Sequence, residues 1–163
     1  MDSLSVDFSQ SRISIYRHKG DHFIMLARVS DNLELQRPGR GSYPDSEGII
    51  HTAWTQKDAC AVDLPEDRVE WEKRCASQYG MDPGALASVS MQCLSIAGTR
   101  IDHSGRSSRP IGLLIVESLT KRGVNGRTMD ALKSSEAYPL LEHILVEAIA
   151  CLDERDVEDF RSI

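Results

Sequence analysis

The segment 110–118, Pro-Ile-Gly-Leu-Leu-Ile-Val-Glu-Ser, is the most hydrophobic stretch of this chain and constrains its fold most strongly. Its β-branched and apolar residues favour a strand. The preceding segment 86–101 mixes polar with β-competent residues, and a flexible polar turn at 104–108 separates the two. We therefore predict that 86–101 and 110–118 pair as an antiparallel hairpin in the middle of a sheet.

A second hairpin is predicted near the N-terminus. Apolar Ile13 and Ile15 alternate with polar neighbours in 12–17, and 22–29 is rich in β-branched and apolar residues. Gly20, between Lys19 and Asp21, suits the tight turn that joins them. The next segment, 32–46, carries several glycines, prolines and polar residues, which predicts a long connection.

The middle of the chain alternates between helix and strand signals. A helix is predicted to begin at a Ser46 cap and end near Lys57, because its apolar residues recur at helical spacing. A short strand over 60–64 is stopped by Pro65. A second helix is predicted over 66–79 and ends at Gly80, and 82–84 forms a turn or a single helical turn.

The C-terminal segment predicts a long amphipathic helix. A glycine-rich loop at Gly123 and Gly126 precedes it, and an apolar stripe including Leu141 and Leu145 recurs at helical spacing over about five turns. Three further apolar residues widen the apolar surface beyond what packing on one side requires. We predict that this surplus supports a homodimer or contact with an adjoining domain of a larger protein, through Val146, Ile149 and Ala150.

Charge and length exclude several classes of function. The chain has 163 residues, which suits one domain, and a net charge of -6 with a pI near 5.3. It lacks the positive surplus that binding to nucleic acid or an anionic membrane requires. No apolar run approaches the ~20 residues of a membrane span, and the first residues do not read as a signal peptide. We expect a soluble, cytoplasmic domain without nucleic acid or direct membrane contact.

The cysteines show no metal-binding pattern. Cys60, Cys75, Cys93 and Cys151 form no CxxC pair and have no histidine pair at zinc-ligand spacing. We predict reduced, mostly buried thiols and no metal site.

Three motifs, in this order, resemble those of the GAF domain family. Residues 46–54, Ser-Glu-Gly-Ile-Ile-His-Thr-Ala-Trp, are similar to the family's Gly-Ile-x-x-x-Ala-Trp helix. Residues 61–67, Ala-Val-Asp-Leu-Pro-Glu-Asp, are similar to its aspartate strand. Residues 109–118 are similar to its Ile-Gly-Val-Leu-x-Leu-x-Ser strand. The resemblance covers roughly residues 12–153.

This resemblance implies an α+β fold of the GAF/PAS-like kind. A central antiparallel β-sheet carries helices on one face, and helices with short strands form a lid over a possible pocket on the other. The expected organisation is an N-terminal extension at 1–11, the GAF-like domain at 12–155 and a tail at 156–163. The family's opening helix is absent from these residues. The Asn-Lys-Phe-Asp-Glu pattern of cyclic-nucleotide-binding members is missing, which argues against that ligand.

The resemblance also implies where a small-molecule ligand would bind. The pocket would be lined by the short strand, the helix after it and the start of the long strand, and aromatic walls with a few polar groups suit such a site. The predicted ligand-binding residues are Cys60, Asp63, Arg68, Trp71, Tyr79, Met91 and Cys93. The identity of a ligand or cofactor is not indicated.

The sequence therefore predicts a non-enzymatic sensor or regulatory domain of a larger signalling protein. One alternative is a structural dimerisation module with a collapsed pocket. Another is a thiol-dependent reductase resembling the free methionine sulfoxide reductases, with Cys60, Cys75 and Cys93 around one pocket. Their surroundings do not match the reductase Gly-His-Ile-Ala-Cys context. The chain also contains no Gly-x-Ser-x-Gly, His-Glu-x-x-His or phosphate-loop motif.

Overall fold

The computed structural model describes residues 6–104 and 109–161, with side chains as far as residue 153. Within these residues one antiparallel sheet runs in the strand order β3-β2-β1-β6-β5-β4. The strands are β1 (Ser11–Lys19), β2 (His22–Val29), β3 (Ser42–Pro44), β4 (Asp58–Ala61), β5 (Ser95–Asp102) and β6 (Pro110–Ser118). The hydrophobic segment 110–118 is thus the central strand β6.

Both predicted hairpins are confirmed. Strands β1 and β2 pair in antiparallel fashion across Gly20, whose φ of 62° lies in the left-handed region that glycine tolerates. Strands β5 and β6 also pair, and β6 pairs on its other side with β1. The predicted turn at 104–108 lies almost wholly outside the described residues.

Two predicted helices are confirmed with small shifts at their starts. Helix α2 spans Gly48–Gln56, and α3 spans Arg68–Tyr79. The predicted Ser46 cap is wrong, because Glu47 occupies the cap position of α2 and makes no side-chain cap hydrogen bond. The Asp67 side chain caps α3 by accepting from the Glu70 N–H, and Gly80 ends it at a φ of 63°. The strand predicted at 60–64 lies earlier, at Asp58–Ala61, because residues 62–65 leave the sheet towards α3.

The segment 86–101 is not one long strand, which corrects the prediction. Asp82 caps a short helix, α4 (Pro83–Leu86), with proline at its first turn, and residues 87–94 are irregular before β5 begins. The predicted long connection at 32–46 contains a short helix, α1 (Leu33–Gln36), and strand β3.

The C-terminal region contains one more helix than predicted. Helix α5 (Gly126–Lys133) begins where only a glycine-rich loop was expected, with a capping box between Asn125 and Thr128. Helix α6 (Ala137–Arg161) is the predicted terminal helix. Its first half packs on the sheet: a Cβ added at Gly112 of β6 would lie 2.9 Å from Leu145 Cδ2.

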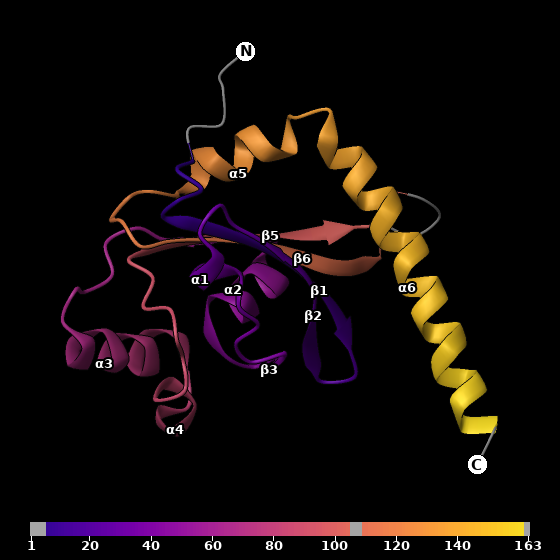
Figure 1. Cartoon of the computed structure of the whole chain (residues 1–163), viewed down its shortest axis with the longest axis horizontal. Helices are drawn as coiled ribbons and strands as arrows, with labels where there is room; N and C mark the ends of the chain where they lie inside the picture. The colour runs from indigo at the N-terminus through magenta and orange to yellow at the C-terminus, as the bar shows by residue number, and fades with distance from the viewer. Residues whose placement is uncertain (1–5, 105–108, 162–163) are drawn as a thin grey trace.

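Figure 1 shows the layers of the molecule. Helices α2, α3 and α4 lie on one side of the sheet, α5 lies on the other, and the far end of α6 extends away from the sheet. Helix α2 lies very close to its face, because a Cβ added at Gly98 would stand 3.2 Å from Ala53 Cβ and 2.6 Å from Ile115 Cδ1. The predicted α+β architecture is confirmed. Among the described residues, no helix is both long and apolar enough to cross a membrane.

Candidate functional site

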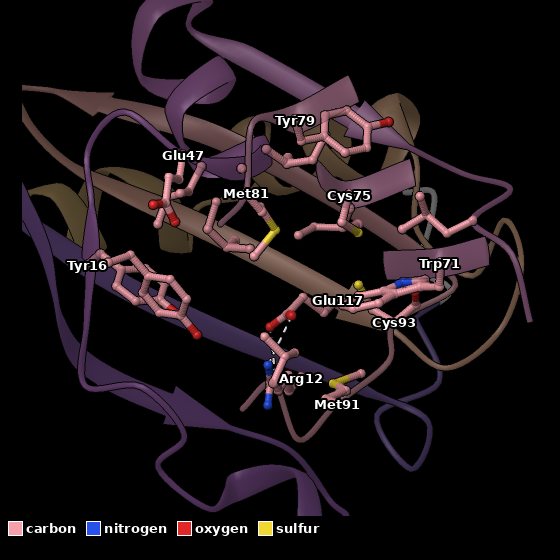
Figure 2. A pocket seen from close by; sticks show the side chains of 18 residues that line it. Arg12, Tyr16, Glu47, Trp71, Cys75, Tyr79, Met81, Met91, Cys93 and Glu117 are labelled. Atoms are coloured by element: carbon pink, nitrogen blue, oxygen red, sulfur yellow. Dashed lines mark hydrogen bonds and ion pairs between the residues drawn. The ribbon is translucent and has the colours of Figure 1, made fainter. Parts of the chain in front are cut away.

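A cavity of about 90 Å³ lies between the sheet and helices α2 and α3. This volume accommodates several water molecules or one small organic molecule. Its floor comes from β1, β5 and β6, and its walls come from α2, α3 and the irregular segment before β5 (Figure 2). It is lined by Arg12, Tyr16, Tyr43, Glu47, Gly48, Ile49, Ile50, Leu64, Trp71, Cys75, Tyr79, Met81, Val89, Met91, Cys93, Ile96, Ile115 and Glu117.

A buried ion pair lies on the cavity floor. Arg12 of β1 and Glu117 of β6 are register partners, and their side chains are only 5% and 12% exposed. Arg12 Nε donates to Glu117 Oε2 at 2.6 Å and Nη2 donates to Oε1 at 3.0 Å. Burial alone would lower the pKa of Arg12, but the Glu117 carboxylate outweighs burial and raises it. The guanidinium therefore stays protonated, and its two hydrogen bonds to the Glu117 side chain make the pair bidentate.

Two tyrosines stand beside this ion pair. The rings of Tyr16 and Tyr43 meet edge to face at 5.7 Å, and Arg28 Nη2 donates to the Tyr16 hydroxyl at 3.3 Å. Burial, followed by nearby negative charge, raises the pKa of both hydroxyls above the ordinary tyrosine value. Both remain protonated near neutral pH and can donate as well as accept hydrogen bonds.

Glu47 adds an unsatisfied acceptor to this polar end. Its Oε2 atom is buried and has no hydrogen-bond partner in the described part of the chain. The nearest cation, Arg40 Nη1, is 3.9 Å away, too far for a hydrogen bond, and is itself buried without one. A buried carboxylate oxygen in this state is costly unless water or a ligand donates to it.

The opposite wall of the cavity is aromatic and rich in sulfur. The Trp71 Nε1–H group donates to the Cys93 carbonyl at 2.8 Å, which fixes the indole of α3 against the start of β5. Cys75, Met81 and Met91 line the same space (Figure 2). Methionine and aromatic surfaces adapt well to apolar groups of varied shape.

The two thiols in this wall, Cys75 and Cys93, are weak nucleophiles at neutral pH. Burial raises the pKa of Cys75 to about 11 and raises that of Cys93 well above its usual range. Because the thiolate is the nucleophile, both side chains react slowly at neutral pH. Cys60 and Cys151, by contrast, are exposed, so the prediction of mostly buried thiols holds for only two of the cysteines.

The predicted ligand-binding residues fall into three groups. Trp71, Tyr79, Met91 and Cys93 line the cavity together. Cys60 does not; it lines a separate groove at the edge of the sheet, which corrects the idea of three cysteines around one pocket.

Asp63 and Arg68 are placed outside the cavity lining. Asp63 accepts from Arg122 at 3.3 Å on the surface. Arg68 stacks over the Trp71 ring at 5.0 Å and donates to the Leu86 carbonyl at 2.7 Å. Its position therefore supports the wall from behind, joining α3 to α4.

The predicted dimerisation residues do not share one free face of α6. Ile149 packs beside the Leu145 cluster against the sheet, whereas Val146 is half-buried and Ala150 is exposed. The large exposed apolar side chains of α6 are instead Leu140 and Ile144, at 59% and 54% exposure. Because residues four apart on a helix lie on one face, Leu140 and Ile144 form one exposed apolar surface.

The polar lining residues Arg12, Tyr16 and Glu117 were not predicted from the sequence. The signal was present in the alternation of β1, where Arg12, Ser14 and Tyr16 share one face and Ile13 and Ile15 share the other. Glu117, a charge at the end of the most hydrophobic strand, was the second indication. In the described residues, no cluster of three or more histidine, cysteine or acidic side chains could hold a metal ion.

Comparisons with known proteins show what this arrangement is similar to. No family model matches the sequence. The search of curated proteins also found no match. Solved structures do match. A GAF domain of an Acinetobacter phosphoenolpyruvate-protein phosphotransferase is 14% identical with a TM-score of 0.54, over 93% of this chain and 78% of that one.

Enzymes are also among the matches. A type II free methionine-R-sulfoxide reductase from Thermoplasma acidophilum is 12% identical with a TM-score of 0.54, over 85% of this chain and 81% of that one. The Neisseria meningitidis free methionine-R-sulfoxide reductase, solved with its substrate, is 16% identical with a TM-score of 0.55, over 88% and 72%.

The chain therefore has a GAF-like fold. That fold is shared by GAF domains such as that of the phosphotransferase and by free methionine-R-sulfoxide reductases. At these identities the likeness concerns the fold alone.

Proposed function

We propose that this chain is a non-enzymatic regulatory domain that binds one small molecule in the cavity beneath α2 and α3. The observation that carries the proposal is the cavity's mixed lining: the Arg12–Glu117 pair with two tyrosines, and beside it the apolar wall around Trp71 (Figure 2). A small-molecule site needs this combination of apolar walls and a few convergent polar groups.

The polar end indicates the kind of ligand. The orphan Glu47 oxygen requires a hydrogen-bond donor, and the tyrosine hydroxyls can supply donors or acceptors. A ligand with an apolar body and a small polar head that donates to Glu47 fits both parts of this lining. Its head would relieve an unsatisfied group rather than create one.

A thermal-shift screen against amino acids, cyclic mono- and dinucleotides, haem and bilins tests the proposal. A ligand present at 100 times its Kd stabilises the folded state by about 2.7 kcal/mol. Val89→Phe places a larger side chain in the cavity and should abolish the shift. Val69→Phe makes the same change on the exposed surface of α3, where Val69 is 59% exposed, and should leave the shift intact.

Two results would contradict the sensor proposal. A flat screen would favour the structural alternative with a closed cavity. A ligand shift that survives Val89→Phe would mean that the ligand binds elsewhere.

Self-association through α6 is the second part of the proposal. Leu140 and Ile144 present apolar surface that the described part of the chain leaves uncovered. Analytical ultracentrifugation should show a dimer that dissociates in Ile144→Glu. His143→Glu, an exposed neighbour on the same helix, is the control. A monomeric wild-type chain would rule this part out.

The reductase remains the second candidate, because two solved reductases share the fold and Cys75 and Cys93 both line the cavity. Reduction of a sulfoxide by two thiols yields a thioether, one disulfide and water. Incubation with free methionine-R-sulfoxide and dithiothreitol, followed by chromatography for methionine, tests it. We expect no turnover above that of Cys93→Ala, because burial keeps both thiols protonated. Turnover lost in that variant would establish the enzyme.

A further inference from the structure

A groove of about 400 Å³ runs along the outer edge of β4 and shares only Ile49 and Tyr79 with the lining of the cavity. Strand β4 is the last strand of the sheet on this side. Helix α2 and the end of α3 form one wall of the groove, and α5 forms the other. An exposed strand edge between two helical walls leaves room for an extended chain and excludes a bulky folded partner.

The backbone of β4 presents unpaired hydrogen-bonding groups to this groove. The Arg100 N–H donates to the Lys57 carbonyl at 2.8 Å. With the register of β4 and β5, this bond makes Ala59 and Ala61 the residues that exchange backbone hydrogen bonds with β5. The N–H and C=O groups of Asp58 and Cys60 therefore point outward. Neither residue has a backbone hydrogen bond to another part of the described chain.

An open strand edge of this kind is a template for a further strand. Backbone N–H and C=O groups are strong hydrogen-bonding groups, and edges usually escape pairing by being covered, bulged or charged. Asp58 and Cys60 are both exposed, and β4 shows no register shift against β5. The edge is short, however, so a partner would gain only a few backbone hydrogen bonds.

The charge of the groove indicates which partner suits it. Lys133 Nζ lies 2.9 and 3.0 Å from the two carboxylate oxygens of Asp58, so these charges neutralise each other. Asp130 is 77% exposed and lies 3.8 Å from the same ammonium group. The groove therefore carries one surplus negative charge at its α5 wall, which favours a basic residue in the partner.

We propose that this groove binds an extended peptide segment of a partner protein, which adds to β4 as a further antiparallel or parallel strand and places a basic side chain beside Asp130. Backbone hydrogen bonds to Asp58 and Cys60 supply the affinity, and Asp130 supplies the preference for charge. The proposal does not rest on the proposed sensor function, although Ile49 and Tyr79 border both the groove and the cavity.

Three labelled heptapeptides test the proposal by fluorescence polarisation. The first, Lys-Thr-Val-Thr-Val-Thr-Lys, should bind with a Kd below about 1 mM. The second replaces both lysines with glutamates and should bind at least about threefold more weakly. The third replaces the central threonine with proline, which cannot donate to the strand edge, and should bind about tenfold more weakly than the first.

Matched variants of the chain locate the binding. Cys60→Pro removes only an outward N–H group, a change that edge strands tolerate, and should weaken the basic peptide about tenfold. Cys60→Ser keeps the N–H group and should bind as the wild type does. Asp130→Lys reverses the surplus charge and should make the acidic peptide the better ligand without altering the backbone of β4.

Several outcomes would overturn the proposal: no binding of the basic peptide at 1 mM, equal binding of the proline peptide, or no change in preference in Asp130→Lys. The Asp130→Lys result does not depend on whether Cys60→Pro folds. Concentration-dependent self-association of the chain that disappears in Cys60→Pro would assign the edge to a second copy and would also refute the proposal.

Discussion

Leu114 and Ile115 are neighbours on β6 with the same 3% exposure, yet they face opposite surroundings. Leu114 joins Ile101 and Leu145 in a cluster under α6. Ile115 lines the cavity between the sheet and helices α2 and α3, together with the buried Arg12–Glu117 pair. The face under α6 is filled mostly with apolar side chains, although Arg17 is buried there beside Asp153, and the other face keeps free space beside an ion pair. Burial alone therefore does not tell which face stabilises the fold and which serves as a site.

The largest effect is expected when a charge enters the filled face. Leu145→Asp should destabilise the fold by at least about 4 kcal/mol, because a carboxylate would be buried among apolar side chains without a partner. Chemical denaturation followed by circular dichroism measures it. His143→Asp, which places the same carboxylate at an exposed polar position of α6, should cost less than about 0.5 kcal/mol. Equal costs would mean that α6 does not pack as described.

A single change in the ion pair should be nearly as costly on the cavity face. Arg12→Met leaves Glu117 buried without its partner and should cost about 3–5 kcal/mol. The double variant Arg12→Met with Glu117→Leu should recover most of that loss, because no unpaired charge remains. Urea denaturation of the four members of this cycle tests both statements. Additive losses would show that the two charges do not interact.

The two neighbours on β6 allow the sharpest comparison of the faces. Leu114→Ala should cost about 2–5 kcal/mol, as such changes do in filled cores. Ile115→Ala should cost about 1 kcal/mol less, because part of its surface already borders free space and loses fewer contacts. Differential scanning calorimetry of both variants measures the difference. An equal or reversed order would mean that the faces are equally well filled.

Alkaline pH should weaken the cavity face in particular. The unfolded thiol of Cys75 ionises near pH 9, whereas burial raises its folded pKa to about 11. The unfolded state therefore loses protons first, and the free energy of unfolding should fall between pH 9 and 11. Denaturation at several pH values measures this slope. Cys75→Ala should make the slope shallower and leave the contribution of Cys93, whose pKa burial also raises, and an unchanged slope would contradict the burial of Cys75.

The smallest effect concerns labelling rather than stability. At pH 8, Ellman's reagent should modify Cys60 and Cys151 quickly and reach Cys75 and Cys93 only as the chain opens. The first phase should disappear in the double variant Cys60→Ser with Cys151→Ser. Rapid modification of all four thiols would show that the cavity wall is open to solvent.

Much of the fold was predictable because local signals and tertiary packing agree. The alternation in β1 and the stop at Gly80 both appear where the sequence places them. The start of α5 was not predicted, although Asn125 and Thr128 form a capping box, because Gly123 and Gly126 favour a loop.

The cavity was only half predictable for a different reason. Trp71 and Tyr79 belong to one helix, so their shared location follows from helical spacing. Arg12 and Glu117 are 105 residues apart, and only the pairing of β1 with β6 brings them together. That pairing depends on tertiary structure, which periodicity in a single sequence does not specify.

The close approach of α2 to Gly98 has a mechanical consequence for the cavity. Because Ala53 packs directly against Gly98, the sheet and α2 form a rigid side of the cavity. Helices α3 and α4 are connected to the sheet by the irregular segments 62–67 and 87–94 (Figure 1). We expect a bulkier ligand to displace α3 and α4 and to leave α2 in place. We therefore expect the identity of the occupant to be read out as the position of α3 and α4.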